Sequence, residues 1–172
     1  MLLFSCRSNE VIQGDRTSQE NDNRELVVES EFEKIEKTDE EWRRVLSPNE
    51  YYIARQQGTE HAFGSAYKEF KNIEKASNKE GVWVCAACGN ELFSANTSFD
   101  SGSGWPSFYE PYGPNSVIEK KDYSHGWVRT EVLCAKCGAH LGHVFDGEGM
   151  KTPTDRRFCI NAGILDHEAE EE

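Results

Sequence analysis

The sequence predicts a mainly β domain, in which a small antiparallel core is preceded by two short helices. Helix start signals occur at Thr38 and Ser47, ahead of the region that reads as strand. From Gly81 onward, short runs of β-branched and aromatic residues alternate with turns rich in glycine and proline. The chain has 172 residues, enough for about one domain with a core that folds without disulfides.

Two capping boxes predict the helices. Thr38 and Ser47 each precede a glutamate by three positions, so each hydroxyl can cap a helix whose glutamate reaches back to the cap. Apolar residues at 42, 45 and 46 recur at helical spacing after the first box. The second helix carries residues 51–53, has Pro48 at the tolerated first position and is expected to end near Gly58.

Four apolar runs predict the strands. They cover residues 82–84, 117–118, 127–133 and 158–165. The turn signals between them are Gly102, residues 104–106, residues 111–114 and the glycines at 147 and 149. Strands this short, separated by turns, favour antiparallel pairing.

The acidic charge lies in the two ends of the chain. The net charge is −12, yet residues 42–167 carry 14 basic and 15 acidic side chains. We therefore expect disordered, solvated tails at 1–36 and 168–172 around a domain at 37–167. The nearly neutral domain has no basic stripe, which excludes a nucleic-acid partner. No apolar run approaches the roughly 20 residues of a transmembrane helix.

The start of the chain leaves two interpretations open. Residues 3–6, which end in Cys6, resemble the end of a bacterial lipoprotein signal, so Cys6 could carry a lipid that tethers the domain to a membrane in the cell envelope. Alternatively, Cys6 is incidental in a frayed terminus, and the protein is cytoplasmic by default. Measuring the intact mass of the native protein would distinguish the two interpretations. The sequence does not indicate the oligomeric state.

Two CxxC pairs, each followed by glycine, predict a structural zinc site. The four thiols belong to Cys85, Cys88, Cys134 and Cys137. Four thiolates fill a tetrahedral site and leave no position open for catalysis. The long separation between the pairs is no objection, because loop closure costs little more for a long loop. Two disulfides or two redox pairs are the alternatives, but no βαβ pattern surrounds either pair.

Cys159 lies outside this set. In a strand, alternation places Arg157, Cys159 and Asn161 on one face, with Phe158 and Ile160 on the other. The guanidinium is expected to lower the pKa of the thiol and favour the reactive thiolate. The alternative is an inert core cysteine beside a solvated arginine, and this segment alone does not decide between them.

Two other motifs bear on Cys159. His140 and His143 have no third or fourth ligand nearby and are better read as proton donors or hydrogen-bond partners. Trp105 stands in a loop held by glycines and Pro106. It is either a packing residue or one wall of an apolar pocket.

Taken together, these motifs resemble the B-type methionine sulfoxide reductases, which reduce the R epimer of methionine sulfoxide. The resemblance spans about residues 38–166 and rests on residues 58–60, both CxxCG knuckles, 99–102, 104–108, 140–146 and 157–161. It implies two small antiparallel sheets, a structural Zn²⁺ far from the chemistry, and Cys159 as the nucleophile. The implied substrates are oxidised proteins, and the implied reductant is thioredoxin or another thiol.

The resemblance also implies a mechanism. The Cys159 thiolate attacks the sulfoxide sulfur and becomes a sulfenic acid, while His143 protonates the oxygen. His140 and Asn161 would orient the oxygen and a water, and Arg157 would stabilise the thiolate. Trp105 would hold the methyl group, with Phe108 and Asp146 as further substrate-binding residues.

The sequence departs from the family pattern at two places. Ser103 stands where many relatives carry a resolving cysteine, so an external thiol is expected to regenerate Cys159. Cys6 is the spare thiol, on a tail that spans roughly 30 Å when flexible. At residues 146–149, the sequence Asp-Gly-Glu-Gly replaces the Asp-Gly-Pro ending that is usual for this motif in the family, which leaves the role of Asp146 open. A non-catalytic zinc-ribbon module and a redox sensor using Cys159 are the alternative functions.

Overall fold

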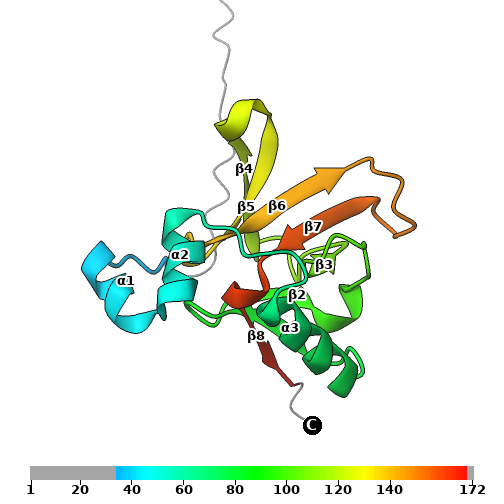
Figure 1. Cartoon of the computed structure of the whole chain (residues 1–172), viewed down its shortest axis with the longest axis horizontal. Coiled ribbons are helices and arrows are strands. Elements are labelled where there is room, and N and C mark those ends of the chain that lie inside the picture. The colour runs from blue at the N-terminus through cyan, green and yellow to red at the C-terminus, as the bar shows by residue number, and fades with distance from the viewer. Residues whose placement is uncertain (1–33, 170–172) are drawn as a thin grey trace, which may run out of the picture.

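The computed structural model describes residues 34–169 and contains three helices and two sheets (Figure 1). The helices are α1 Asp39–Val45, α2 Pro48–Gln56 and α3 Ser65–Ala76. The strands are β1 Val82–Cys85, β2 Glu91–Ser94, β3 Ser107–Phe108, β4 Val117–Asp122, β5 Arg129–Cys134, β6 His140–Asp146, β7 Arg156–Ile160 and β8 Leu165–Glu168. No helix in this part of the chain is long and apolar enough to cross a bilayer.

Most of the two predicted tails, including Cys6, lies outside the described residues. At its start, the described chain already contacts the body, because the Ile35 N–H donates to the Lys136 carbonyl at 2.8 Å. At its end, β8 reaches Glu168. The body therefore extends slightly into both segments predicted as tails.

Both predicted capping boxes form. Thr38 caps α1 and Ser47 caps α2, each with its glutamate returning to the cap backbone. Helix α2 ends at Gln56, near Gly58 as predicted, and its C-cap Gln57 takes the left-handed conformation, with φ of 55°. A Cβ at Gly58 would come within 2.3 Å of the Tyr52 ring, so a side chain there would require that ring to move.

Helix α3 was not predicted from the sequence. Its N-cap is Gly64, which makes no side-chain cap, so the start signal of the first two helices is absent. The helix is held by packing: the Phe70 ring lies 4.5 Å from Trp83 of β1 and 6.0 Å from Phe108 of β3, between centroids. It thereby contacts both sheets.

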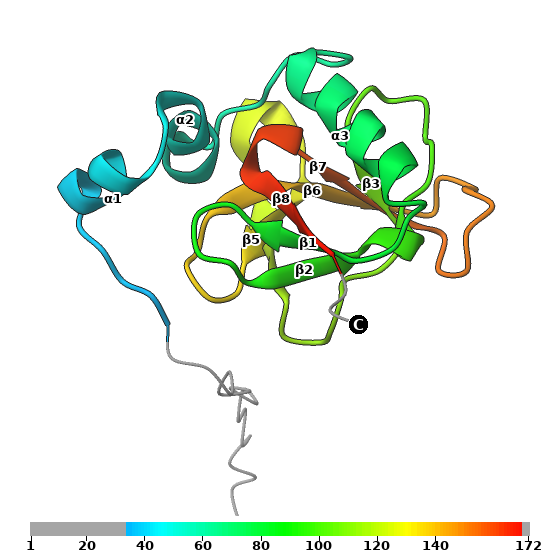
Figure 2. The same cartoon turned by 90° about the horizontal axis from the view of Figure 1, so that it is seen from below.

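The two antiparallel sheets have the strand orders β2-β1-β8 and β3-β7-β6-β5-β4, which confirms the predicted fold class. The strands of the smaller sheet are labelled in Figure 2. Strands β2, β3 and β6 were missed. The β6 segment contains two histidines and a glycine, which are weak strand signals. Gly142 is nevertheless required there, because a Cβ would lie 2.0 Å from the Cys159 carbonyl oxygen.

Two predicted strands need correction. The run 158–165 is two strands in different sheets, β7 and β8, joined by a 3₁₀ turn at residues 162–164. The Glu60 carboxylate holds this turn by accepting from the Ala162 and Gly163 N–H groups. The run 127–133 begins as strand only at Arg129, while Trp127 and Val128 are 74% and 67% exposed in the preceding turn.

The core is formed by aromatic and aliphatic side chains from both sheets. Phe93 of β2 stacks on Phe108 of β3 at 4.4 Å between ring centroids, and Phe158 of β7 lies 5.7 Å from Phe93. All three rings are fully buried. Each such burial stabilises the fold by about 1.5–3 kcal/mol. The side chains that face the cavity beside Cys159 are therefore supported by a well-packed core.

Candidate active site and metal centre

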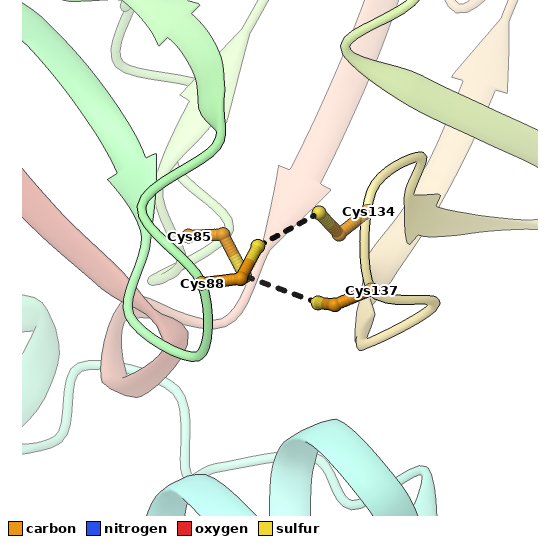
Figure 3. A group of neighbouring side chains, drawn as sticks. All are labelled: Cys85, Cys88, Cys134 and Cys137. Atoms are coloured by element: carbon orange, nitrogen blue, oxygen red, sulfur yellow. Dashed lines mark hydrogen bonds between the residues drawn. The ribbon is translucent and has the colours of Figure 1, made fainter. Parts of the chain in front are cut away.

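The four clustered cysteines come from two turns (Figure 3). Cys85 and Cys88 lie on the turn between β1 and β2, whereas Cys134 and Cys137 lie between β5 and β6. Their sulfur atoms are all within 4.8 Å of one another, with 3.8 Å from Cys85 to Cys137 and 3.6 Å from Cys88 to Cys134. All four thiols are free, which argues against the disulfide alternative.

The cluster fits a tetrahedral metal ion. Bonds of about 2.3 Å from sulfur to metal give sulfur–sulfur edges of about 3.8 Å, close to the separations found. The two turns also have the same backbone geometry. Gly89 and Gly138 both have φ of 68°, and each N–H donates to the carbonyl of the first cysteine of its pair, at 2.7 and 2.9 Å. The four cysteines can hold a metal ion that ties one sheet to the other.

A separate cavity of about 160 Å³ opens beside Cys159. Strands β6 and β7 form its floor, and the loops after α2 and before β3 form its sides. Its lining residues are Thr59, Trp105, Arg129, Gly142, His143, Phe145, Cys159 and Asn161. None of the clustered cysteines lines it, so metal site and cavity are distinct.

Cys159 lies on β7 with the predicted alternation. Phe158 and Ile160 point into the core and are fully buried, whereas Cys159 and Asn161 line the cavity. The register pairs Cys159 with His143 on β6. Residues directly opposite each other in an antiparallel pair share a face. The fold thus places the thiol and an imidazole in one cavity.

Arg157 lowers the pKa of Cys159 as predicted, but the burial of the thiol has a larger and opposite effect. Burial raises the pKa of the thiol above its ordinary value, and the Arg157 guanidinium and Ser103 hydroxyl offset this only in part. Arg157 also forms an ion pair, because its Nε and Nη2 donate to the Glu148 carboxylate at 2.8 and 3.0 Å. The Glu148 charge raises the pKa of Cys159 further. Burial therefore favours the thiol over the thiolate at Cys159.

Glu148→Gln is expected to speed alkylation of Cys159 by iodoacetamide severalfold at neutral pH. Removing the negative charge lowers the pKa of the thiol, so the thiolate fraction at a fixed pH rises. Alkylation rates measured by mass spectrometry across pH 6–10 should move toward lower pH. Asp166→Gln on β8 is the control, because Asp166 lies in the other sheet. An unshifted Glu148→Gln profile would contradict the role of this carboxylate.

The two histidines are held differently. His143 Nε2 lies 2.8 Å from Asp122 Oδ2, and the ring lines the Cys159 cavity. His140 is buried, with Nδ1 2.7 Å from Glu131 Oε1, and does not line that cavity. Burial lowers the pKa of His140, which keeps this ring neutral. His143 is therefore the histidine that shares the cavity with Cys159.

Behind His143 lies a second, polar cavity of about 240 Å³. Its lining residues are Gln56, Gln57, Thr59, Asp122, Ser124, Arg129, Glu131, His140 and His143. His140 Nε2 is buried and finds no hydrogen-bond partner among the described residues.

Glu60 anchors two walls of the Cys159 cavity through its backbone. The Trp105 Nε1–H donates to the Glu60 carbonyl at 3.1 Å, and the Glu60 N–H donates to Asn161 Oδ1 at 3.0 Å. Asn161 Nδ2 also donates to the Leu141 carbonyl at 2.9 Å. Because its amide is engaged at both ends with backbone, Asn161 shapes the cavity wall.

Two residues predicted to bind substrate lie elsewhere. Phe108 is fully buried in the core between Phe93 and Phe70 and does not line the cavity. Asp146 has a 62% exposed side chain that pairs with Arg156 Nε at 2.7 Å, outside the cavity. The structure brings together Cys159, His143, Trp105 and Asn161, with Arg157 beside the thiol.

Sequence reasoning missed the polar residues that support the cavity, which are Thr59, Asp122, Arg129 and Glu131. Asp122 ends a run of charged residues on β4 that reads as a solvated strand. Of these four residues, only Thr59 belongs to a motif that was recognised in the sequence, at residues 58–60. No local sequence pattern marks the other three as functional.

Residues 46–169 match the SelR domain. The chain belongs to the SelR domain family. Proteins similar to this SelR chain include the peptide methionine sulfoxide reductase MsrB of Leptospira interrogans, 51% identical over 79% of this chain and 97% of the relative. The protein of the same name from Pseudomonas savastanoi pv. phaseolicola is 50% identical over 78% and 96%. That from Methanosarcina barkeri is 49% identical over 80% and 91%. The family resemblance inferred from the motifs is thereby confirmed.

Proposed function

We propose that this protein reduces methionine (R)-sulfoxide in oxidised proteins to methionine through Cys159. The observation that carries the proposal is a thiol outside the cysteine cluster that shares a small cavity with His143 and the indole of Trp105. The names of the relatives support a methionine sulfoxide reductase, and the preference for the R epimer rests on the family resemblance. Trp105 and Phe145 offer apolar surface to the substrate methyl group.

The oxygen transfer balances without an outside proton. The Cys159 sulfur bonds to the sulfoxide sulfur. As this intermediate collapses, the S–S bond and the sulfoxide S–O bond break, the oxygen bonds to the Cys159 sulfur as a sulfenic acid, and methionine leaves. The substrate sulfur gains two electrons and the Cys159 sulfur loses two. The proton that leaves the thiol ends on the transferred oxygen. Since burial favours the thiol, a base in the cavity must first take this proton, and His143 is positioned for it.

The sulfenic acid then needs an external dithiol of the thioredoxin class. One thiol attacks the Cys159 sulfur, releases the oxygen as water and forms a mixed disulfide, which the second thiol resolves. The Ser103 Oγ lies 3.9 Å from the Cys159 Sγ, and a serine cannot form a disulfide.

Ser103→Cys is expected to create a resolving cysteine. A sulfur at this distance needs a shift of roughly 2 Å to reach disulfide bonding distance. After one equivalent of sulfoxide, the variant should lose two hydrogens by intact mass, whereas the parent protein should carry a sulfenic acid that dimedone traps. Ser101→Cys is the matched control, because Ser101 hydrogen-bonds Ser103 and Ser107 rather than Cys159. Equal dimedone labelling of Ser103→Cys and parent would count against this geometry.

We also propose that the metal is Zn²⁺ and that its role is structural. Four thiolates are the ligand set that closed zinc sites use, and zinc would supply a rigid cross-link without redox chemistry. Elemental analysis of freshly purified, reduced protein should give one zinc per chain. A metal content near zero in folded protein would reject the assignment.

An epimer-resolved assay tests the proposed function directly. With racemic methionine sulfoxide in a peptide and excess dithiol, conversion should stop at one half and leave only the S epimer. A redox sensor would stop after about one equivalent of protein, and a zinc-ribbon binding module would convert nothing. Running the assay with thioredoxin and with a small dithiol identifies the reductant class.

A further inference from the structure

The imidazole of His143 is oriented by a single carboxylate, that of Asp122. His143 Nε2 lies 2.8 Å from Asp122 Oδ2, although the two residues are 21 positions apart. Asp122 ends β4 and is fixed on both oxygens, because Oδ1 accepts from the Ser124 N–H at 2.8 Å and Oδ2 from Arg129 Nη2 at 2.7 Å. Hydrogen bonds from the side chain of Ser124, from His143, from the Ser124 N–H and from Arg129 hold the pKa of Asp122 well below its usual range, so it is ionised at neutral pH.

An ionised carboxylate can only accept hydrogen bonds. The ring nitrogen that faces Asp122 therefore carries a proton. In neutral His143 this proton is on Nε2, and Nδ1 is left with a free lone pair. Because Nε2 is occupied by Asp122, Nδ1 is the nitrogen available to the cavity that His143 shares with Cys159.

The register places the thiol opposite this ring. His143 and Cys159 are cross-strand partners on β6 and β7, and Cβ atoms of such partners are about 4.5–5.5 Å apart. Asp122 thus contacts the imidazole of His143, and His143 in turn shares a cavity and a cross-strand position with Cys159. The same order of groups activates nucleophiles in other enzymes.

The remaining ionisable groups around His143 are already committed. On β5, Arg129 donates to Asp122, and Glu131 binds both His140 and Gln57, the latter at 3.0 Å. On β6, His140 is neutral because of its burial. Asp122 is consequently the carboxylate in direct contact with His143.

We infer that Asp122 is a positioning residue for the reaction, holding His143 with Nδ1 free to take the Cys159 proton and stabilising the resulting imidazolium. The inference rests on the proposed function. The proton on Nδ1 is then delivered to the sulfoxide oxygen as the S–O bond breaks, so His143 acts first as base and then as acid. One proton moves from sulfur to nitrogen to oxygen, and none is gained or lost.

Asp122→Asn tests this with almost no change in shape. Its amide N–H group can donate to Nε2, which would move the ring proton to Nδ1 and leave no base facing the thiol. We expect kcat to fall at least tenfold with KM within about twofold, since the corresponding change in a Ser-His-Asp triad costs about 10⁴-fold. Iodoacetamide alkylation of Cys159 should require higher pH, and the ¹⁵N shifts of His143 should report protonated Nδ1.

Glu119→Gln is the matched control. Glu119 lies on the same strand, also pairs with an arginine, Arg156 Nη2 at 2.7 Å, and loses the same charge. It should keep parental kcat and His143 shifts. Metal content and melting temperature establish that both variants fold, and Asp122→Glu, which keeps a carboxylate, should recover part of the rate even if the amide variant is unstable.

A double-mutant cycle with His143→Ala decides whether Asp122 acts through His143. In that background, Asp122→Asn should cause no further loss, whereas a purely structural role would give additive losses and contradict the inference. Unchanged kcat and unchanged His143 shifts in Asp122→Asn would also overturn it. The shifts and the alkylation profile are measured without sulfoxide, so they test Asp122 even if the protein fails to reduce the proposed substrate.

Discussion

Cys159→Ser is expected to abolish sulfoxide reduction while leaving the fold and the metal in place. A hydroxyl is a far weaker nucleophile than a thiol at neutral pH, and its oxygen cannot become a sulfenic acid. The substitution removes one sulfur from the cavity wall and leaves Phe158 and Ile160 in the core. Activity should fall below detection in the epimer-resolved assay, while melting temperature and metal content match those of the parent protein.

Ser103→Ala is the matched control for this result. Ser103 lies beside the same sulfur, but the proposed reaction forms no bond to it. The variant should keep most of its activity and form the same dimedone adduct on Cys159. Residual activity of Cys159→Ser above a few per cent of the parent would show that another thiol is the nucleophile and would end the proposed mechanism.

Local signals in the sequence were sufficient for some of these elements. The boxes at Thr38 and Ser47 predict α1 and α2 because both partners of each cap lie within one helical turn. Alternation along residues 157–161 predicts that Cys159 points away from the core, because the alternation of side chains in a strand is also a local property. The β7–β8 break was not visible, since the turn is fixed by Glu60, about a hundred positions earlier in the chain.

The candidate site also has some features that local sequence patterns predict and others that they do not. Its sulfur, imidazole and indole were predicted from their motifs, and Arg157 lowers the pKa of Cys159 as predicted. The larger, opposite effect of burial on this pKa was not predicted, because it depends on the packing around the thiol. Asp122 could not be found from sequence, since its approach to His143 depends on the registers of β4 with β5 and of β5 with β6. Pairing between strands that are distant in sequence therefore determines contacts that local sequence patterns cannot predict.

Loss of the metal is expected to have the largest effect on stability, and Cys134→Ser is the variant that tests it. Cys134 is fully buried at the end of β5. Its loss removes one of four ligands that join the β1–β2 turn to the β5–β6 turn. Structural zinc sites contribute about 10–16 kcal/mol of apparent binding free energy in small peptides. Even a loss of about 4 kcal/mol would lower the melting temperature by about 10 °C in a domain of this size.

The metal-ligand variant should separate stability from catalysis. Cys159→Ser is its control, because it makes the same atomic change outside the cluster and should retain one metal per chain. Since no clustered cysteine lines the Cys159 cavity, the folded fraction of Cys134→Ser should keep the parental KM, and kcat should fall only with that fraction. A stable, metal-free Cys134→Ser protein would show that the two sheets hold together without the cross-link. A changed KM in fully folded protein would show that the metal site is coupled to the cavity.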